Sequence, residues 1–260
     1  MALTLPAIGA NAAIHYVTAG GTGDGSSWTQ ASGDLQAAID ASASGDEIWV
    51  SAGTYAPTTL IKSTKKTSKA FIMKDGVSLY GGFEGNETSL DARKGNAVTI
   101  LSADDETPDT WTRELQDGYR WTWTTEDNVV PGSKDNSTHV LYCAAALTST
   151  TVVDGFTLTG GNANVWNVKA AGGAVYGLGK LALKNCIITE NSAYFTAEGN
   201  DSNTYGGAVY LDGGSMENCH VSKAYSHSSY GNGIGGGVYA KNATIRDCSF
   251  EDCVGLDGGG

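Results

Sequence analysis

Several features are scarce in this chain, and each scarcity argues against a class of structure or function. Only 4 of the 260 residues are proline, whereas 36 are glycine, a balance that suits many tight turns rather than a flexible linker. No run of 18 apolar residues occurs, so we expect no membrane-spanning helix. Basic residues number 16 against 28 acidic ones, a net charge of −12. Such a surface repels phosphate backbones, and we expect no nucleic-acid partner.

Residues that bind metals or form disulfides are also few. The four histidines show no metal spacing such as HxxxH. We expect His220 and His227 to flank an exposed turn, and a catalytic role for this pair is disfavoured. The five cysteines are an odd number. Three of them recur at one position of a repeat, where stacked strands would lie about 4.7–4.9 Å apart. Disulfides need Cβ atoms about 3.8 Å apart, so a column of buried thiols is favoured over disulfides.

The most regular feature that is present is the motif GGAVY, which occurs three times. The copies begin at Gly172, Gly206 and Gly235, the last written GGGVY, and Gly258–Gly260 is expected to begin a fourth. A second segment follows each copy at nearly constant spacing and carries one cysteine: Cys186, Cys219 and Cys248. Two motifs that repeat in fixed phase predict a stacked-repeat architecture. Strand-like runs before Gly172 indicate that the rungs begin earlier, and Phe156 takes the cysteine position in one of them.

The start of the chain has the cleavage-site pattern of an export signal but lacks its basic residues. Residues 1–12 are apolar and then small, with Ala10-Asn11-Ala12 in the pattern of a cleavage site, although no Lys or Arg precedes Lys62. We interpret this segment as the remnant of an export signal, with a disordered terminus as the alternative. Residues 13–260 are expected to form a single domain whose C-terminal end is incomplete.

One amphipathic helix is expected near the start of this domain. Leu35, Ala38, Ile39 and Ser42 follow helical spacing. Its expected N-cap and C′ residues are Ser32 and Gly45. Because a stack of strands exposes its first rung to water, we expect this helix to cap the stack.

An insertion at residues 102–138 interrupts the strands and is rich in aromatic residues. Strict alternation over residues 119–123 places three rings on one face of an extended segment. These rings either stack on sugars or pack against the flank of the solenoid as a satellite core. The glycan-binding candidates are Trp111, Tyr119, Trp121 and Trp123.

These motifs resemble those of exported bacterial proteins with a right-handed parallel β-helix, the pectin-lyase-like group. The repeat is similar to that of chlamydial polymorphic outer-membrane proteins, which pairs GGA[ILV] with FxxN. GGAV occurs at 172–175 and 206–209, but the second half is poorly kept, as in Ile188-Thr189-Glu190-Asn191. Segments 45–50 and 79–83 also resemble large surface proteins of Bacteroidetes-type bacteria.

The resemblance implies an all-β fold, a right-handed parallel β-helix with an N-terminal capping helix. In such a coil, equivalent positions of successive rungs form columns. One inward column is expected to consist of Val175, Val209 and Val238, and another of Cys186, Cys219 and Cys248. Alternation adds a third, Ile188, Val221 and Phe250. The tyrosines after each valine, Tyr176, Tyr210 and Tyr239, should stack outside the core or at a corner.

The resemblance implies a non-catalytic secreted or cell-surface protein, associated with the outer membrane, that contacts glycans or cell-surface proteins as a monomer. The alternative is a polysaccharide lyase or glycoside hydrolase. The chain has no Arg-x-Pro-x-x-Arg run, and Asp104-Asp105 stands without the other motifs of a polygalacturonase. Asp247 shares a column with Asn218 and Asn185, where a polar ladder is favoured over a carboxylate pair. We therefore expect no catalytic residue and no cofactor, with Ca²⁺ as an open possibility.

Overall fold

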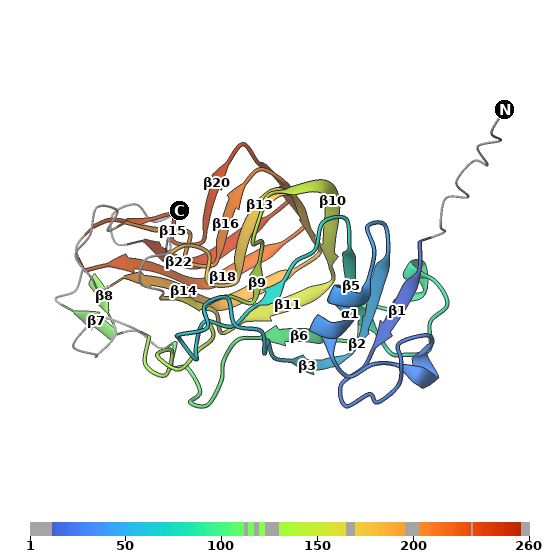
Figure 1. Cartoon of the computed structure of the whole chain (residues 1–260). Helices are drawn as coiled ribbons and strands as arrows, with labels where there is room; N and C mark the ends of the chain where they lie inside the picture. The colour runs from blue at the N-terminus through green and yellow to red at the C-terminus, as the bar shows by residue number, and fades with distance from the viewer. Residues whose placement is uncertain are drawn as a thin grey trace.

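The computed structural model describes residues 12–111, 114–116, 120–122, 130–164, 170–195, 203–229 and 231–255. Its strands pair in parallel almost throughout, and the described residues contain one short α-helix. The coil makes about six turns, which confirms the predicted all-β parallel solenoid. Figure 1 shows the turns stacked from β1 at one end to β20 and β22 at the other.

Three walls of strands enclose the core. The first wall consists of β1 (Ile14–Val17), β2 (Glu47–Ser51), β5 (Ser78–Phe83), β10 (Leu147–Asp154), β13 (Val175–Lys184), β17 (Ser215–Glu217) and β21 (Thr244–Arg246). The second consists of β3 (Gly53–Tyr55), β6 (Thr99–Ser102), β11 (Phe156–Thr159), β14 (Ile187–Phe195), β18 (His220–Ser228) and β22 (Ser249–Gly255). The third consists of β4 (Phe71–Ile72), β9 (Leu141–Tyr142), the first half of β13, β16 (Val209–Asp212) and β20 (Val238–Lys241). Because β13 belongs to two walls, its hydrogen bonding continues around a corner of the coil.

Shorter elements fill the corners between the walls. They are the strands β12 (Asn162–Ala163), β15 (Thr204–Tyr205) and β19 (Gly233–Ile234), and the 3-10 turns η1 (Trp28–Gln30) and η2 (Leu90–Ala92).

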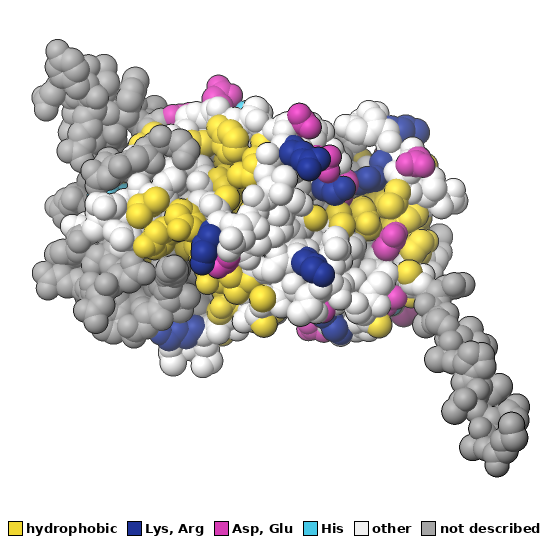
Figure 2. Space-filling model, turned by 90° about the horizontal axis from the view of Figure 1, so that it is seen from above, with side chains coloured by type: hydrophobic (Ala, Val, Ile, Leu, Met, Phe, Trp, Pro, Cys, Tyr) yellow, Lys and Arg dark blue, Asp and Glu magenta, His cyan; other side chains and the backbone are white. Residues whose placement is uncertain are grey.

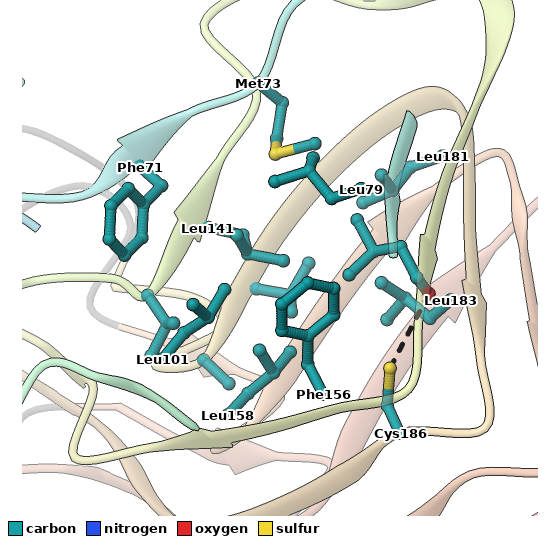
Figure 3. Close-up of a cluster of buried hydrophobic side chains, with 14 of the residues drawn as sticks. Phe71, Met73, Leu79, Leu101, Leu141, Phe156, Leu158, Leu181, Leu183 and Cys186 are labelled. Atoms are coloured by element: carbon teal, nitrogen blue, oxygen red, sulfur yellow. Dashed lines mark hydrogen bonds between the residues drawn. The ribbon is translucent and has the colours of Figure 1, made fainter. Parts of the chain in front are cut away.

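The repeat places one residue type at the same position of each turn. The valine column and the column at Ile188 are in the predicted register: Val175, Val209 and Val238, and Ile188, Val221 and Phe250. Their members are fully buried in the inner turns, whereas Phe250, on the last described strand, is 48 % exposed. Side chains from all three walls meet in the interior (Figure 3).

The predicted thiol column is also present. Cys186 and Cys219 are buried and Cys248 is half-buried, and all three are free thiols. Phe156, in the equivalent position of the preceding turn, is buried as well. A hydrogen bond with Cys219, together with burial, raises the pKa of the Cys186 thiol. Burial places Cys186 and Cys219 among the apolar residues of the core, with Cys248 packed against them.

An aromatic column follows the valines on the outer side of the third wall. Its rings stack at centroid distances of 5.1–5.4 Å in the order His139, Tyr142, Tyr176, Tyr210, Tyr239. The predicted tyrosine stack is confirmed, and it extends two residues further toward the N-terminus than the GGAVY motif.

The corner between the first and second walls repeats one backbone conformation. Gly155, Asn185, Asn218 and Asp247 have φ of 79°, 50°, 51° and 51°, a left-handed region in which Asn and Asp are the most tolerated residues after glycine. The Asn185 amide donates to Asp154 at 3.1 Å, and the Asn218 amide donates to Asn185 at 2.8 Å. The predicted polar ladder is thus confirmed between Asn185 and Asn218, and it continues to Asp154 of the preceding turn.

The helix α1 (Leu35–Ala41) differs at both ends from the expectation. Its N-cap is Asp34, whose carboxylate accepts a backbone N–H of the first turn at 2.9 Å. Ser32 is instead held in an extended segment that pairs with β1. The helix ends with Ser42 as its C-cap, so Gly45 lies beyond the C′ position and makes a separate turn with φ 102°. Both cap assignments from the sequence were therefore wrong.

The side chain of Gln36 connects α1 to the edge of the third wall. Gln36 donates to the backbone oxygen of Ile72 at 3.3 Å and accepts from its backbone nitrogen at 2.8 Å. Leu35 and Ile39 of the same helix are buried in the core. The Gln36 carboxamide therefore supplies the hydrogen bonds that a neighbouring strand would give to the edge strand β4.

Replacing Gln36 with alanine should lower the free energy of unfolding by about 1–3 kcal/mol, because it leaves the donor and the acceptor of Ile72 without partners. Urea unfolding measures this loss, and the Ile72 amide should exchange faster with solvent. Gln30→Ala, which removes an exposed glutamine, is the control. Equal losses in the two variants would contradict the capping role.

Candidate functional site

A groove of about 390 Å³ opens on the outside of the solenoid at the corner between the first and second walls. Gly81 of β5 and Gly155, in the turn between β10 and β11, both line it. Val98 and Ile187 stand at its rim and are 56 % and 49 % exposed. Exposed apolar side chains beside a hollow are typical of a ligand-binding surface.

Arg93 is the central polar residue of this groove. Its Nη1 donates to the carboxylate of Asp154 and to the backbone oxygen of Gly81, both at 3.0 Å. Its Nε donates to the backbone oxygen of Leu90 at 3.1 Å. Within the described part of the chain, Nη2 makes no hydrogen bond. The guanidinium is therefore fixed in place with one nitrogen still available to a ligand.

Two aromatic rings pack against the guanidinium. The Arg93 guanidinium carbon lies 5.5 Å from the ring centre of Phe83 and 5.8 Å from that of Tyr80, within the range of cation–π contacts. Burial raises the pKa of the Tyr80 phenol, so this ring stays neutral. The rings restrict Arg93 further, and little conformational entropy is lost when a ligand binds it.

Acidic side chains in the groove offset the positive charge of Arg93. Both carboxylate oxygens of Asp154 are engaged, one by Arg93 and one by Asn185, and Asp91 also lines the groove. On the face drawn in Figure 2, basic side chains stand beside acidic ones rather than in a separate patch. The groove therefore suits a neutral, hydroxyl-rich ligand better than a polyanion.

The insertion carries most of the candidates from the sequence. Its strands β7 (Glu114–Gln116) and β8 (Arg120–Thr122) pair antiparallel, which agrees with the extended segment that the alternation predicts. The main chain of Trp121 belongs to β8, but its side chain, Tyr119 and Trp123 lie outside the described residues.

Trp111 is the one aromatic candidate whose side chain is described. It is half-buried and packs with Val130 and Tyr225 in a small cluster that also includes Val254. The start of the insertion, at Trp111, therefore lies against β18 and β22, which come more than 100 residues later in the chain. For Trp111 this contact corresponds to the satellite core, and the residue does not line the Arg93 groove.

The other acidic and histidine candidates do not come together. Asp105 forms an ion pair with Lys69 at 2.8 Å, and burial raises the pKa of its neighbour Asp104. His220 and His227 lie near opposite ends of the single strand β18, so the expectation that they flank an exposed turn was wrong. Neither Asp104 with Asp105 nor His220 with His227 therefore forms a catalytic dyad.

A residue of the insertion that the sequence did not single out is Asp109. Burial raises the pKa of its carboxyl to about 7, although an amide hydrogen bond from Asn136 at 2.8 Å lowers it. The surroundings of Asp109 therefore accommodate an unpaired negative charge poorly.

No protein-family model and no curated protein sequence matches this chain. Among solved structures, it is similar to a rhamnogalacturonan lyase, with a TM-score of 0.42 and 16 % identity. The match covers 92 % of this chain and 51 % of that one, so the chain spans about half the length of the lyase structure. At this identity the likeness concerns the fold alone. Among the described residues, no helix has the length and apolar character needed to cross a membrane.

Sequence reasoning missed Arg93 and Asp154 as site residues. They are 61 positions apart and lie in different repeats, so no local motif connects them. The available signal was the scarcity of arginine, since only four occur, together with an aspartate directly before a turn glycine.

Proposed function

We propose that this protein binds a neutral glycan in the Arg93 groove without cleaving it, as a secreted or cell-surface solenoid. The observation that carries the proposal is the fixed Arg93 guanidinium beside the exposed apolar rim of Val98 and Ile187. A sugar ring offers both kinds of surface at once, because its hydroxyls accept from a guanidinium while its C–H face contacts apolar side chains. The groove volume of about 390 Å³ falls within the range of about 300–1,000 Å³ for ligand pockets.

Hydrogen-bond acceptors in the groove support the same ligand class. Asn185 and Asp154 stand beside Arg93, so that donors and acceptors lie side by side. Vicinal hydroxyl groups both donate and accept, and such a mixed row of partners satisfies them.

Cleavage of a polysaccharide is the second candidate function, favoured by the presence of Asp154 and Asp91 in one groove with an arginine. Hydrolysis needs two carboxyl groups about 5–9.5 Å apart, one of them free to take up a proton. Asp154 holds Arg93 and Asn185 with its two oxygens, which fits binding better than proton transfer. Release of reducing or unsaturated ends from any polysaccharide would overturn the non-catalytic proposal.

A Val98→Ala, Ile187→Ala double variant should bind its glycan about 5–30-fold more weakly, corresponding to about 1–2 kcal/mol of lost apolar contact. A glycan array with the unmodified protein identifies the ligand, and titration calorimetry measures the change. Both side chains are largely exposed, so the fold should be unaffected. Leu60→Ala, which removes a 43 % exposed leucine outside the groove, is the matched control.

The same array separates the groove from the aromatic segment of the insertion. A Trp121→Ala, Trp123→Ala variant should retain binding if the groove is the site. Binding that is lost in this variant and kept in the groove variant would move the site to the insertion and overturn the assignment to Arg93.

A further inference from the structure

The outer face of the second wall carries three polar side chains that lie next to one another. Nδ1 of His220, on β18, is 2.8 Å from Oγ of Ser249, on β22. Nε2 of the same ring is 3.9 Å from Oε2 of Glu251, also on β22. A serine, a histidine and a carboxylate therefore stand in a row with the imidazole in the middle. None of the three residues lines the Arg93 groove.

The regular pairing of the solenoid brings these side chains together. His220 and Ser249 are direct partners in the register of β18 and β22. Glu251 follows Ser249 by two residues, so alternation places both side chains on the same face of β22. Val221, next to His220, is fully buried in the core, and His220 therefore faces outward with them. The backbone alone thus fixes which side chains meet.

This order meets the requirements of a serine nucleophile. A general base must lie within about 2.6–3.2 Å of the hydroxyl, and a third group orients the base. His220 satisfies the first condition. The carboxylate of Glu251 beside Nε2 favours the tautomer with its proton on that nitrogen, which leaves the lone pair of Nδ1 to accept the proton of Ser249.

The row is open to a substrate. The side chains of His220 and Glu251 are 39 % and 77 % exposed, and Ser249 is exposed as well. Another outward-facing serine of the same wall lacks this arrangement, because Ser222 donates to Oγ1 of Thr189 at 3.0 Å. The histidine contact therefore distinguishes Ser249 from its neighbour on the same face.

We propose that Ser249, His220 and Glu251 form an acyl-transfer site that hydrolyses small carboxylic esters. Oγ of Ser249 forms a bond to the carbonyl carbon while its proton passes to Nδ1 of His220. That proton then goes to the leaving alkoxide as the C–O bond of the ester breaks. Water repeats both steps on the acyl-serine, which releases the carboxylic acid and restores the two side chains.

The expected acceleration follows from the openness of the site. On an exposed sheet face the rate gain comes from general-base catalysis, which contributes about 10²–10⁴-fold. Esters with good leaving groups are therefore the substrates on which the activity is measured most easily. This inference does not depend on the glycan proposal, because the reaction needs no ligand in the Arg93 groove.

Hydrolysis of p-nitrophenyl acetate by the purified chain tests the site. We expect Ser249→Ala and His220→Gln each to lower kcat/KM at least tenfold, and a fluorophosphonate probe to attach to Ser249 in peptide mass spectrometry. Ser222→Ala is the matched control and should keep both the activity and the labelling. The three side chains lie on the outer face, so circular dichroism should show an intact coil in every variant. A Ser249→Ala variant as active as the unmodified chain, or a probe attached to another residue, would overturn the proposal.

Glu251 acts through His220 and is therefore a positioning residue. Glu251→Gln should lower kcat about 2–5-fold, the effect of an exposed charge pair, and leave KM unchanged. Glu190→Gln removes a carboxylate of the same wall that pairs with Lys223 at 2.6 Å and should keep the kcat of the unmodified chain. Equal kcat values in the two variants would overturn the role of Glu251.

Discussion

A Gly172→Ala variant should lose about 2–5 kcal/mol of folding free energy, with a fall in Tm on the order of 5–20 °C. Gly172 has φ 61°, a region that costs other residues about 1–2 kcal/mol. A Cβ atom here would also lie 2.7 Å from the backbone nitrogen of Tyr210 and closer still to the backbone oxygen of Val175. Neither backbone group can move without breaking the pairing of β13 with β16. Thermal and urea unfolding measure the loss.

Gly95→Ala is the matched control for this variant. Gly95 has φ 75°, but a Cβ atom built on it meets no atom within 4 Å. Its loss should therefore be limited to the conformational cost of about 1–2 kcal/mol. If the two variants lose the same free energy, close approach of neighbouring turns is not the reason for the glycine in GGAVY.

Acidification should destabilise the coil by about 3 kcal/mol between pH 6.5 and pH 4 through His139 alone. Burial lowers the pKa of this histidine to about 4, and its hydrogen bond to the backbone oxygen of Gly172, at 2.8 Å, only partly offsets that effect. In this pH window the unfolded chain binds a proton that the native imidazole does not bind. Stability therefore rises with pH up to about 6.5 and then levels off.

The His139→Asn variant should show a flatter dependence of unfolding free energy on pH between 6.5 and 4, because asparagine keeps a donor near Gly172 but does not titrate. Urea unfolding at a series of pH values gives the slope. His220→Asn, which removes a partly exposed imidazole, is the matched variant for comparison. A His139→Asn slope equal to that of the unmodified chain would contradict the role of the buried histidine.

The regular part of the fold was predictable from the sequence. Each GGAVY copy carries its own turn, core residue and stacking ring, so spacing alone placed Val175 above Val209 and Tyr176 above Tyr210. The position of Phe156 followed from the same phase. These features are local and repeated, so the position of a residue in one turn predicts the position of its counterpart in the next.

The irregular parts were not predictable in the same way. Ser32 is a good N-cap by type, but its backbone is committed to pairing with β1, so Asp34 takes that role. The contact of Arg93 with Asp154 depends on the offset between two rungs and on the loop that follows β5. The hydrogen bond between Asn136 and Asp109 depends on where the insertion returns to the coil. The insertion has no repeat, so the sequence offers no periodicity from which to infer that contact.

The polar ladder at Asn185 and Asn218 has a consequence for how such a chain grows during evolution. Asn185 donates to the turn before it and accepts from the turn after it, and Asn218 donates to Asn185 in the same way. A carboxamide carries both a donor and an acceptor, so it suits every turn of such a column. A gene segment that encodes one complete turn could therefore be duplicated in place, and the new copy would meet the partners that the old one already had. The cross-section of the molecule is fixed by this chemistry, while its length is free to change in steps of one turn.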